Sequence, residues 1–135
     1  KERVVDIEEY RERVSLPAPG KVSAGTGYWQ EDDYDTMVDF YADEIPDADE
    51  YDTIAIVVGH SMEPRIKNGD FLFIKKTPQI ESGEIGIFRV NGENYVKQLK
   101  VGYLKSLNPE YKDVDLSEHD DVRTIGKVVD VYRGN

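Results

Sequence analysis

The distribution of apolar residues along the chain predicts a mostly β-structured domain. From residue 51 onward, apolar runs of strand length recur about every ten residues, and turn residues such as Gly, Pro and Asn separate them. The expected strands are residues 53–58, 70–75, 84–90, 94–100, 103–107 and 123–132. Asn91-Gly92 falls between two of these runs and is typical of a type I′ hairpin turn. The pattern favours a compact β-barrel or sandwich with short helical turns.

The first twenty residues differ from the rest of the chain. Their charged beginning holds a few apolar positions that fit a short helix only weakly, and Pro17-Ala18-Pro19-Gly20 stops any helix. We therefore expect residues 1–20 to form a linker and residues 21–135 to form the domain. The segment 15–28 is expected to be extended at most.

Residues 30–50 are rich in Asp and Glu. Within them Val38 and Phe40 alternate with polar positions, which indicates a short strand that ends before Pro46. A helix over residues 34–44 is the alternative. The acidic side chains are expected to cover a solvated face or loop.

Composition narrows the class of protein. The chain has 135 residues, enough for one domain, and 28 acidic against 17 basic residues, which gives a net charge of -11. Phosphate backbones repel such a surface, so direct nucleic-acid binding by this domain is not expected. The chain has no cysteine and two histidines, which excludes disulfides and thiolate catalysis and predicts no metal or other cofactor.

No membrane or secretory segment is visible. No apolar run approaches the roughly 20 residues that a spanning helix needs, and the charged N-terminus lacks the apolar stretch of a signal peptide. We expect a cytoplasmic protein without a membrane partner. The chain starts at Lys1 rather than Met, so we expect it to be a piece of a longer protein.

A serine stands at the most informative turn. The segment 59–64 (Gly-His-Ser-Met-Glu-Pro) follows the apolar run 53–58, so Ser61 lies where a strand ends and its hydroxyl can act as a nucleophile. A helix N-cap is the competing role, and Pro64 at an early helical position fits it. The two roles are compatible, because a helix start also offers unpaired backbone N–H groups to an oxyanion.

The base that would activate this serine is expected to be a lysine. His60 is adjacent to Ser61 and would point to the opposite face of an extended strand, and His119 lies in a polar loop. Lys97 lies in a segment that reads as half-buried strand, where burial would lower its pKa toward the neutral amine that a Ser-Lys pair requires. A solvated lysine on an edge strand is the alternative, and Lys100 fits that description.

Several segments together resemble a known family. They are 59–64, Asn68-Gly69-Asp70 and Val96-Lys97-Gln98-Leu99, with Asn108-Pro109-Glu110-Tyr111 further on. They are similar to the C-terminal domain of LexA and lambda-type phage repressors, which are self-cleaving serine/lysine peptidases. The resemblance covers about residues 21–132. His60 departs from the family, which often has an acid there.

The resemblance implies a LexA-like β-fold and a role for each residue. Ser61 would be the nucleophile, Lys97 the base, and amides around Gly59 and Met62 would hold the oxyanion. Val22-Ser23-Ala24-Gly25 resembles the region in which the Ala24–Gly25 bond is cut.

It also implies partners. These are a second copy in a homodimer, and a RecA filament or an antirepressor as inducer. Operator DNA would be bound only through an N-terminal helix-turn-helix domain, which this sequence lacks. Two alternatives stay open: a dimerisation and regulator-binding module that no longer cleaves, and a polymerase accessory protein of the UmuD type.

Overall fold

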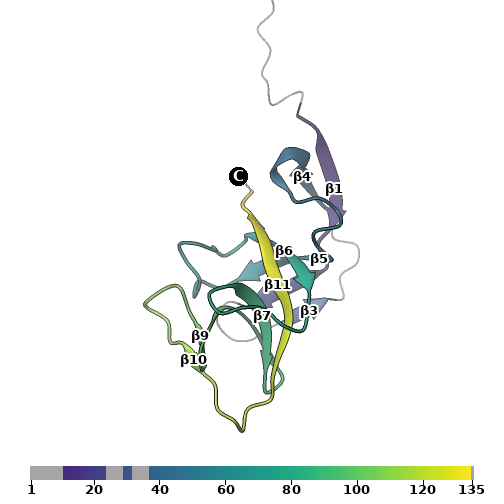
Figure 1. Ribbon diagram of the computed structural model, residues 1–135. Coiled ribbons are helices and arrows are strands. Elements are labelled where there is room, and N and C mark those ends of the chain that lie inside the picture. The colour runs from purple at the N-terminus through teal and green to yellow at the C-terminus, as the bar shows by residue number, and fades with distance from the viewer. Residues whose placement is uncertain (1–10, 24–28, 32–36, 135) are drawn as a thin grey trace, which may run out of the picture.

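The computed structural model describes residues 11–23, 29–31 and 37–134, and nearly all of the regular structure in them is β (Figure 1). A two-stranded sheet pairs β1 with β4, and a nine-stranded sheet has the order β10-β9-β8-β7-β11-β6-β5-β2-β3. The strands are β1 (Arg13–Pro17), β2 (Gly20–Ser23), β3 (Trp29–Glu31), β4 (Met37–Tyr41), β5 (Thr53–Val58), β6 (Phe71–Lys76), β7 (Ile85–Val90), β8 (Glu93–Lys100), β9 (Tyr103–Lys105), β10 (Val114–Asp115) and β11 (Val122–Tyr132).

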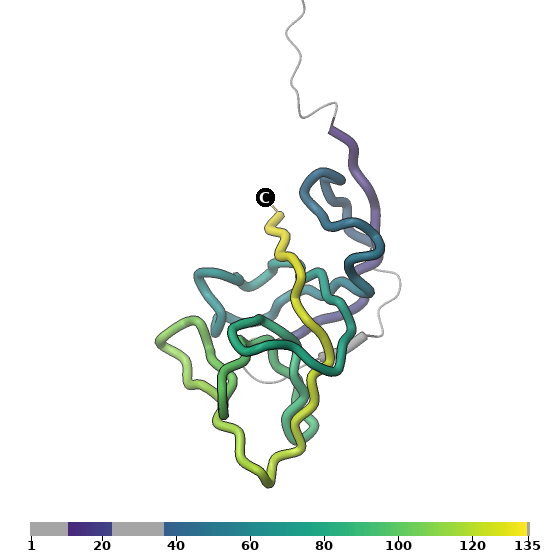
Figure 2. Tube along the Cα trace, in the orientation of Figure 1, coloured from purple at the N-terminus to yellow at the C-terminus, as the bar shows by residue number. Residues whose placement is uncertain are grey.

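The larger sheet curls into a half-barrel. Strand β2 lies beside β5 in parallel and pairs with β3, yet both β2 and β3 also contact β8, which belongs to the other half of the sheet. The sheet therefore bends around an apolar core, and Figure 2 shows the course of the chain through it. The core residues are Val22, Ala55, Val57, Met62, Ile66, Leu72, Ile74, Ile85, Ile87 and Val96. The predicted mostly-β, LexA-like fold is confirmed.

The strands expected after residue 51 are present within a few residues of their predicted bounds. Strands β7 and β8 form the expected hairpin, and its two central residues, Asn91 and Gly92, have φ of 50° and 86°. Two positive φ values in succession are the signature of a type I′ turn, whose twist matches that of the flanking strands. The Asn-Gly prediction is therefore confirmed.

A second, aromatic core attaches the two-stranded sheet of β1 and β4 to the larger sheet. Phe40 of β4 is fully buried and meets Phe71, Phe73 and Tyr132 edge to face, with ring centroids 4.8–5.4 Å apart. The alternation of Val38 and Phe40 thus marks a strand, and the alternative helix over 34–44 is wrong for the described residues 37–41. In the described residues 37–50, the helical structure is a single 3-10 turn at Ala42–Glu44 (η2).

The segment expected to act as a linker enters regular structure at its C-terminal end. Arg13–Pro17 pairs with β4, Ala18 is buried, and Gly20 begins β2 of the larger sheet. Residues 1–10, on which the weak helical pattern falls, lie outside the described residues.

Candidate active site

Ser61 lies on a tight turn that follows β5. The turn starts at Gly59, whose φ of 108° is a conformation that glycine adopts without strain. The Gly59 amide donates to Oδ1 of Asn68 over 2.9 Å, and the Asn68 amide donates to Glu63 over 3.2 Å. We call residues 59–63 the serine turn. The expected turn at Asn68-Gly69 is hydrogen-bonded to both ends of it and holds it on one side.

The alternative that Ser61 caps an α-helix is wrong. Residues 61–65 form turns, with one helix-like hydrogen bond from the Ile66 amide to the Met62 carbonyl (3.0 Å). The Ser61 hydroxyl instead accepts a hydrogen bond from Nζ of Lys97 over 2.7 Å. A serine that follows a strand and precedes Pro64 is locally indistinguishable from a cap, so only the position of Lys97 separates the two roles.

Lys97 comes from β8, 36 residues along the chain from Ser61. Its strand faces β7, where Gly86 is its cross-strand neighbour. The side chain is 2% exposed and Ser61 is 1% exposed, so both members of the pair are inside the protein. The expected inward orientation of Lys97 is therefore confirmed, and the solvated edge lysine is wrong for this position.

Burial changes the acidity of this lysine. Loss of hydration lowers the pKa of Lys97 to about 8, and the negative charge of Asp113 partly opposes the shift. At pH 7 roughly a tenth of such amines are neutral, whereas a solvated lysine is almost entirely protonated. The pair can thus supply a neutral amine hydrogen-bonded to a hydroxyl near physiological pH.

A loop that follows β9 packs against the serine turn. We call residues 106–113 the bracing loop. Its Asn108 amide donates to the Ser61 carbonyl (2.9 Å), Asn108 Nδ2 donates to the His60 carbonyl (3.0 Å), and the Leu107 amide contacts Met62 Sδ (3.5 Å). The sequence singled out Asn108 only as part of a resemblance, without a role. It gave no signal for Asp113, because an acid in a polar loop is unremarkable.

The two residues expected to serve an oxyanion differ in what they offer. The amide of Gly59 already donates to Asn68. Within the described part of the chain, the amides of Ser61 and Met62 donate no hydrogen bond, while the Met62 side chain is fully buried in the core. Gly59 thus shapes the turn, and the available donors are the amides of Ser61 and Met62.

Both histidines have other partners. His60 Nδ1 contacts Oε2 of Glu63 over 2.8 Å, and this hydrogen bond lowers the pKa of the Glu63 carboxyl. The His119 side chain is 89% exposed beside Glu118. The geometry agrees with the choice of a lysine rather than a histidine as the partner of Ser61.

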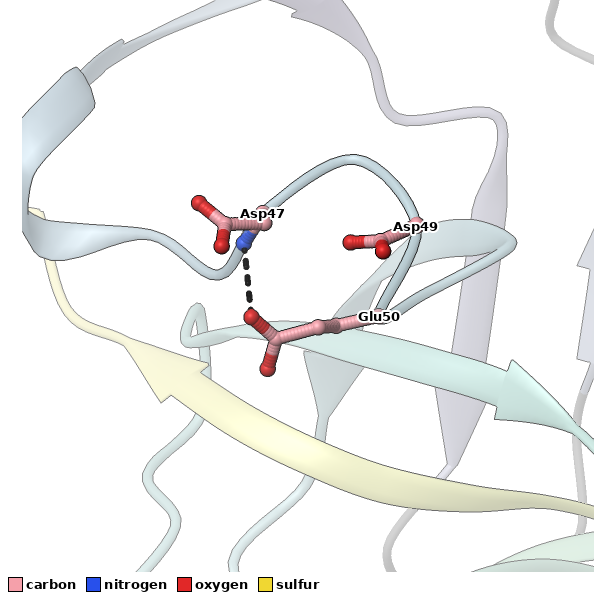
Figure 3. A group of neighbouring side chains, drawn as sticks. All are labelled: Asp47, Asp49 and Glu50. Atoms are coloured by element: carbon pink, nitrogen blue, oxygen red, sulfur yellow. Dashed lines mark hydrogen bonds between the residues drawn. The ribbon is translucent and has the colours of Figure 1, made fainter.

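One group of carboxylates has a spacing that would suit a metal ion. Ligand atoms of Asp47, Asp49 and Glu50 lie within 4.8 Å of one another on an exposed loop (Figure 3). The Asp47 amide donates to Oε1 of Glu50, and the Glu50 amide donates to the Asp47 carbonyl. These bonds close an ordinary acidic turn, and the group lies on a different loop from Ser61 and Lys97.

The expected scissile pair, Ala24 and Gly25, lies outside the described residues. The last described residue before it, Ser23, is paired with Val58 at the end of β5. Adjacent strands lie about 4.8 Å apart, and three residues from Val58 to Ser61 span at most about 11 Å. The chain therefore leaves β2 beside the turn that carries the serine.

The described helical structure contains no segment long and apolar enough to cross a membrane.

Comparison with known proteins identifies relatives along nearly the whole chain. Residues 17–129 match the model of the Peptidase S24-like family. The LexA repressor of Thermosipho melanesiensis is 26% identical over 136 residues, which cover 97% of this chain and 67% of that protein. The LexA repressor of Mannheimia succiniciproducens is 32% identical over 142 residues, covering 98% and 65%.

The chain thus spans about two thirds of the length of the curated relatives it matches. The expected resemblance to the LexA C-terminal peptidase domain is confirmed by the family match and by these relatives. The chain belongs to the Peptidase S24-like family.

Proposed function

We propose that this chain is the self-cleaving peptidase domain of a LexA-type transcriptional repressor, with Ser61 as nucleophile and Lys97 as general base. The observation that carries the proposal is the buried 2.7 Å hydrogen bond between Lys97 Nζ and Ser61 Oγ. A serine hydroxyl is a weak nucleophile until a neighbouring base takes its proton, and a lysine serves only as a neutral amine. The lowered pKa of Lys97 supplies that form.

The substrate in this proposal is the Ala24–Gly25 bond of the same chain. Ser61 Oγ attacks the Ala24 carbonyl carbon while its proton passes to Lys97 Nζ, and the oxyanion is held by backbone amides at Ser61 and Met62. The carbon–nitrogen bond then breaks, and Lys97 returns the proton to the leaving Gly25 amine. Water then attacks the resulting ester while its proton passes to Lys97. As the ester bond breaks, Lys97 gives that proton to Ser61 Oγ, and the new Ala24 carboxyl group ionises to a carboxylate.

Two features favour a segment of the chain itself over a free peptide. Ser61 is almost inaccessible, so an outside protein could reach it only after a rearrangement. Strand β2 ends beside β5 at Ser23, which brings the following residues close to the serine turn. The small residues Ala24 and Gly25 would allow the backbone to approach the hydroxyl closely.

The proposed repressor function also implies the partners of the protein. A repressor of this type would act as a homodimer and bind operator DNA through an N-terminal domain beyond this chain, in the cytoplasm. Cleavage would separate that domain from the dimerising one. Its rate would scale with the fraction of molecules whose cleavage segment is docked, so a RecA filament or an antirepressor would act by raising that fraction.

Incubation of the purified chain from neutral to alkaline pH, followed by mass spectrometry, tests the proposal. The expected product is a fragment of residues 25–135 that forms in the wild-type chain and in Lys100→Ala, a matched control on the same strand. Ser61→Ala and Lys97→Ala should both abolish it. A chain that stays intact at alkaline pH, with and without RecA filament, would instead support a dimerisation module that does not cleave.

A further inference from the structure

One residue of the bracing loop holds the two peptide groups on either side of Ser61. The peptide before Ser61 contains the His60 carbonyl, which accepts from Asn108 Nδ2 over 3.0 Å and from the Glu63 amide over 3.1 Å. The peptide after it contains the Ser61 carbonyl, which accepts from the Asn108 amide over 2.9 Å. Fixing both planes fixes both backbone dihedral angles of the serine between them.

The same contacts set the direction of two amide groups. In a planar trans peptide the carbonyl and the N–H point to opposite sides, and neither of these two peptides is cis. Both carbonyls point toward Asn108, so the N–H groups of Ser61 and Met62 both point away from it. Successive amides that point to the same side of the chain can form a concave site for negative charge.

We propose that Asn108 is a positioning residue that aims the amides of Ser61 and Met62 at the oxyanion formed during cleavage. The inference rests on the proposed function of Ser61 and adds a residue to it. Asn108 acts through the two carbonyls and is not itself a catalytic group.

The bracing loop is built to hold Asn108 in place. The Glu110 amide donates to Asn108 Oδ1 over 3.0 Å, which leaves Nδ2 directed at His60. Ser106 is 3% exposed, and it ties the loop together by donating from its hydroxyl to the Lys112 carbonyl and from its amide to Asp113. Pairing between β9 and β10 closes the ends of the loop. The anchor is therefore rigid enough to transmit its position to the serine turn.

The substitution Asn108→Asp separates this role from a general effect on folding. It replaces the side-chain donor to the His60 carbonyl with a carboxylate oxygen and leaves the Glu63 amide as the remaining donor to that carbonyl. The acceptor that Glu110 uses is kept. Asn108→Ala removes both groups without adding charge, so it shows whether repulsion explains the result. Asn91→Asp is the matched control, because Nδ2 of Asn91, in the turn of the β7–β8 hairpin, also joins two segments by donating to Asp120 in the loop before β11.

The first measurement is the rate of self-cleavage against pH for folded protein. We expect both Asn108 variants to lower the alkaline plateau about tenfold, less than the roughly 10²–10³-fold loss seen when an oxyanion donor itself is removed. The pH midpoint of Asn108→Ala should stay at the wild-type value, because neither the burial of Lys97 nor the charge of Asp113 changes. The new carboxylate of Asn108→Asp should shift the midpoint toward higher pH, in the same direction as Asp113. Asn91→Asp should stay within about twofold of wild type. A wild-type plateau in the Asn108 variants, or a loss equal to that of Asn91→Asp, would overturn the inference.

The second measurement does not depend on cleavage. Residual dipolar couplings of the backbone amides report N–H directions, and they are recorded at mildly acidic pH, where Lys97 is protonated. We expect the coupling of the Ser61 amide to change in Asn108→Asp, and that of Met62 to change less, since the residue-108 amide remains. An unchanged Ser61 coupling would overturn the inference whatever the rate. Absence of cleavage in the wild type would overturn only the proposed function, and the couplings would still decide the role of Asn108.

Discussion

The buried amine of Lys97 should make the stability of the fold depend on pH in a way that one substitution removes. Lys97→Met keeps a long unbranched side chain and deletes the titrating group. Both forms are studied with Ser61→Ala, so that no cleavage occurs at alkaline pH. The desolvation that lowers the pKa of Lys97 comes from the surrounding core and is retained in this background.

The direction of this pH dependence follows from whether the folded or the unfolded state holds the proton of Lys97. Below pH 8 the amine is charged in both states, and the folded state bears the full cost of burying it. Above that pH the folded protein releases the proton, while the unfolded chain keeps it up to its ordinary pKa. The unfolded state then binds more protons, so stability rises with pH across this window and is lost again as the pH falls through 8.

The size of the effect follows from the shift. Lowering the pKa from its ordinary value near 10.4 to about 8 costs the folded state about 3 kcal/mol of unfolding free energy when the amine is fully charged. About 2–3 kcal/mol of this is regained between pH 7 and pH 10. Urea unfolding of both proteins at several pH values gives the difference in unfolding free energy, in which the other titrating groups cancel. A difference that stays flat from pH 7 to pH 10 would refute a depressed pKa for Lys97.

Three further outcomes are expected. Asp113→Asn keeps an acceptor for the Ser106 amide but removes the charge that raises the pKa of Lys97, so the midpoint of the cleavage pH profile should move to lower pH; an unmoved midpoint contradicts this. Gly126→Ala should lower the free energy of unfolding in urea by about 1–3 kcal/mol, because its Cβ would lie 2.8 Å from the Lys75 carbonyl oxygen. An unchanged free energy would show that the backbone of β6 can shift away from the new methyl group without cost. Phe40→Ala should lower the free energy of unfolding by about 3–5 kcal/mol, because it leaves a cavity in the aromatic core. A loss below about 1 kcal/mol would mean that the two-stranded sheet of β1 and β4 adds little to the stability of the domain.

Local pattern was sufficient for much of the sheet. The apolar runs after residue 51 became strands, and Asn91-Gly92 became the expected hairpin turn, because strand length, burial and turn conformation are encoded by neighbouring residues. The same logic found the strand at Val38 and Phe40.

Pairings between distant segments were not encoded in this way. Val14 and Leu16 alternate with polar residues in Arg13–Pro17, but this short pattern does not say which strand it pairs with; the pairing with β4 over the aromatic core decides that. The parallel alignment of β2 with β5 is likewise invisible in either segment alone. It was that pairing, rather than the composition of the N-terminal region, that brought Ser23 beside the serine turn.

By itself the sequence determined the local setting of the site: a serine after a strand, a lysine on another strand, and a resemblance that joined them. Only the tertiary structure decided that Lys97 is buried, that its amine lies 2.7 Å from Ser61 and that Asp113 opposes its shift in pKa. It also placed Asn108 against both carbonyls that flank the serine. The reason is physical: hydration, electric field and hydrogen-bond geometry depend on distances in space between segments that are far apart along the chain.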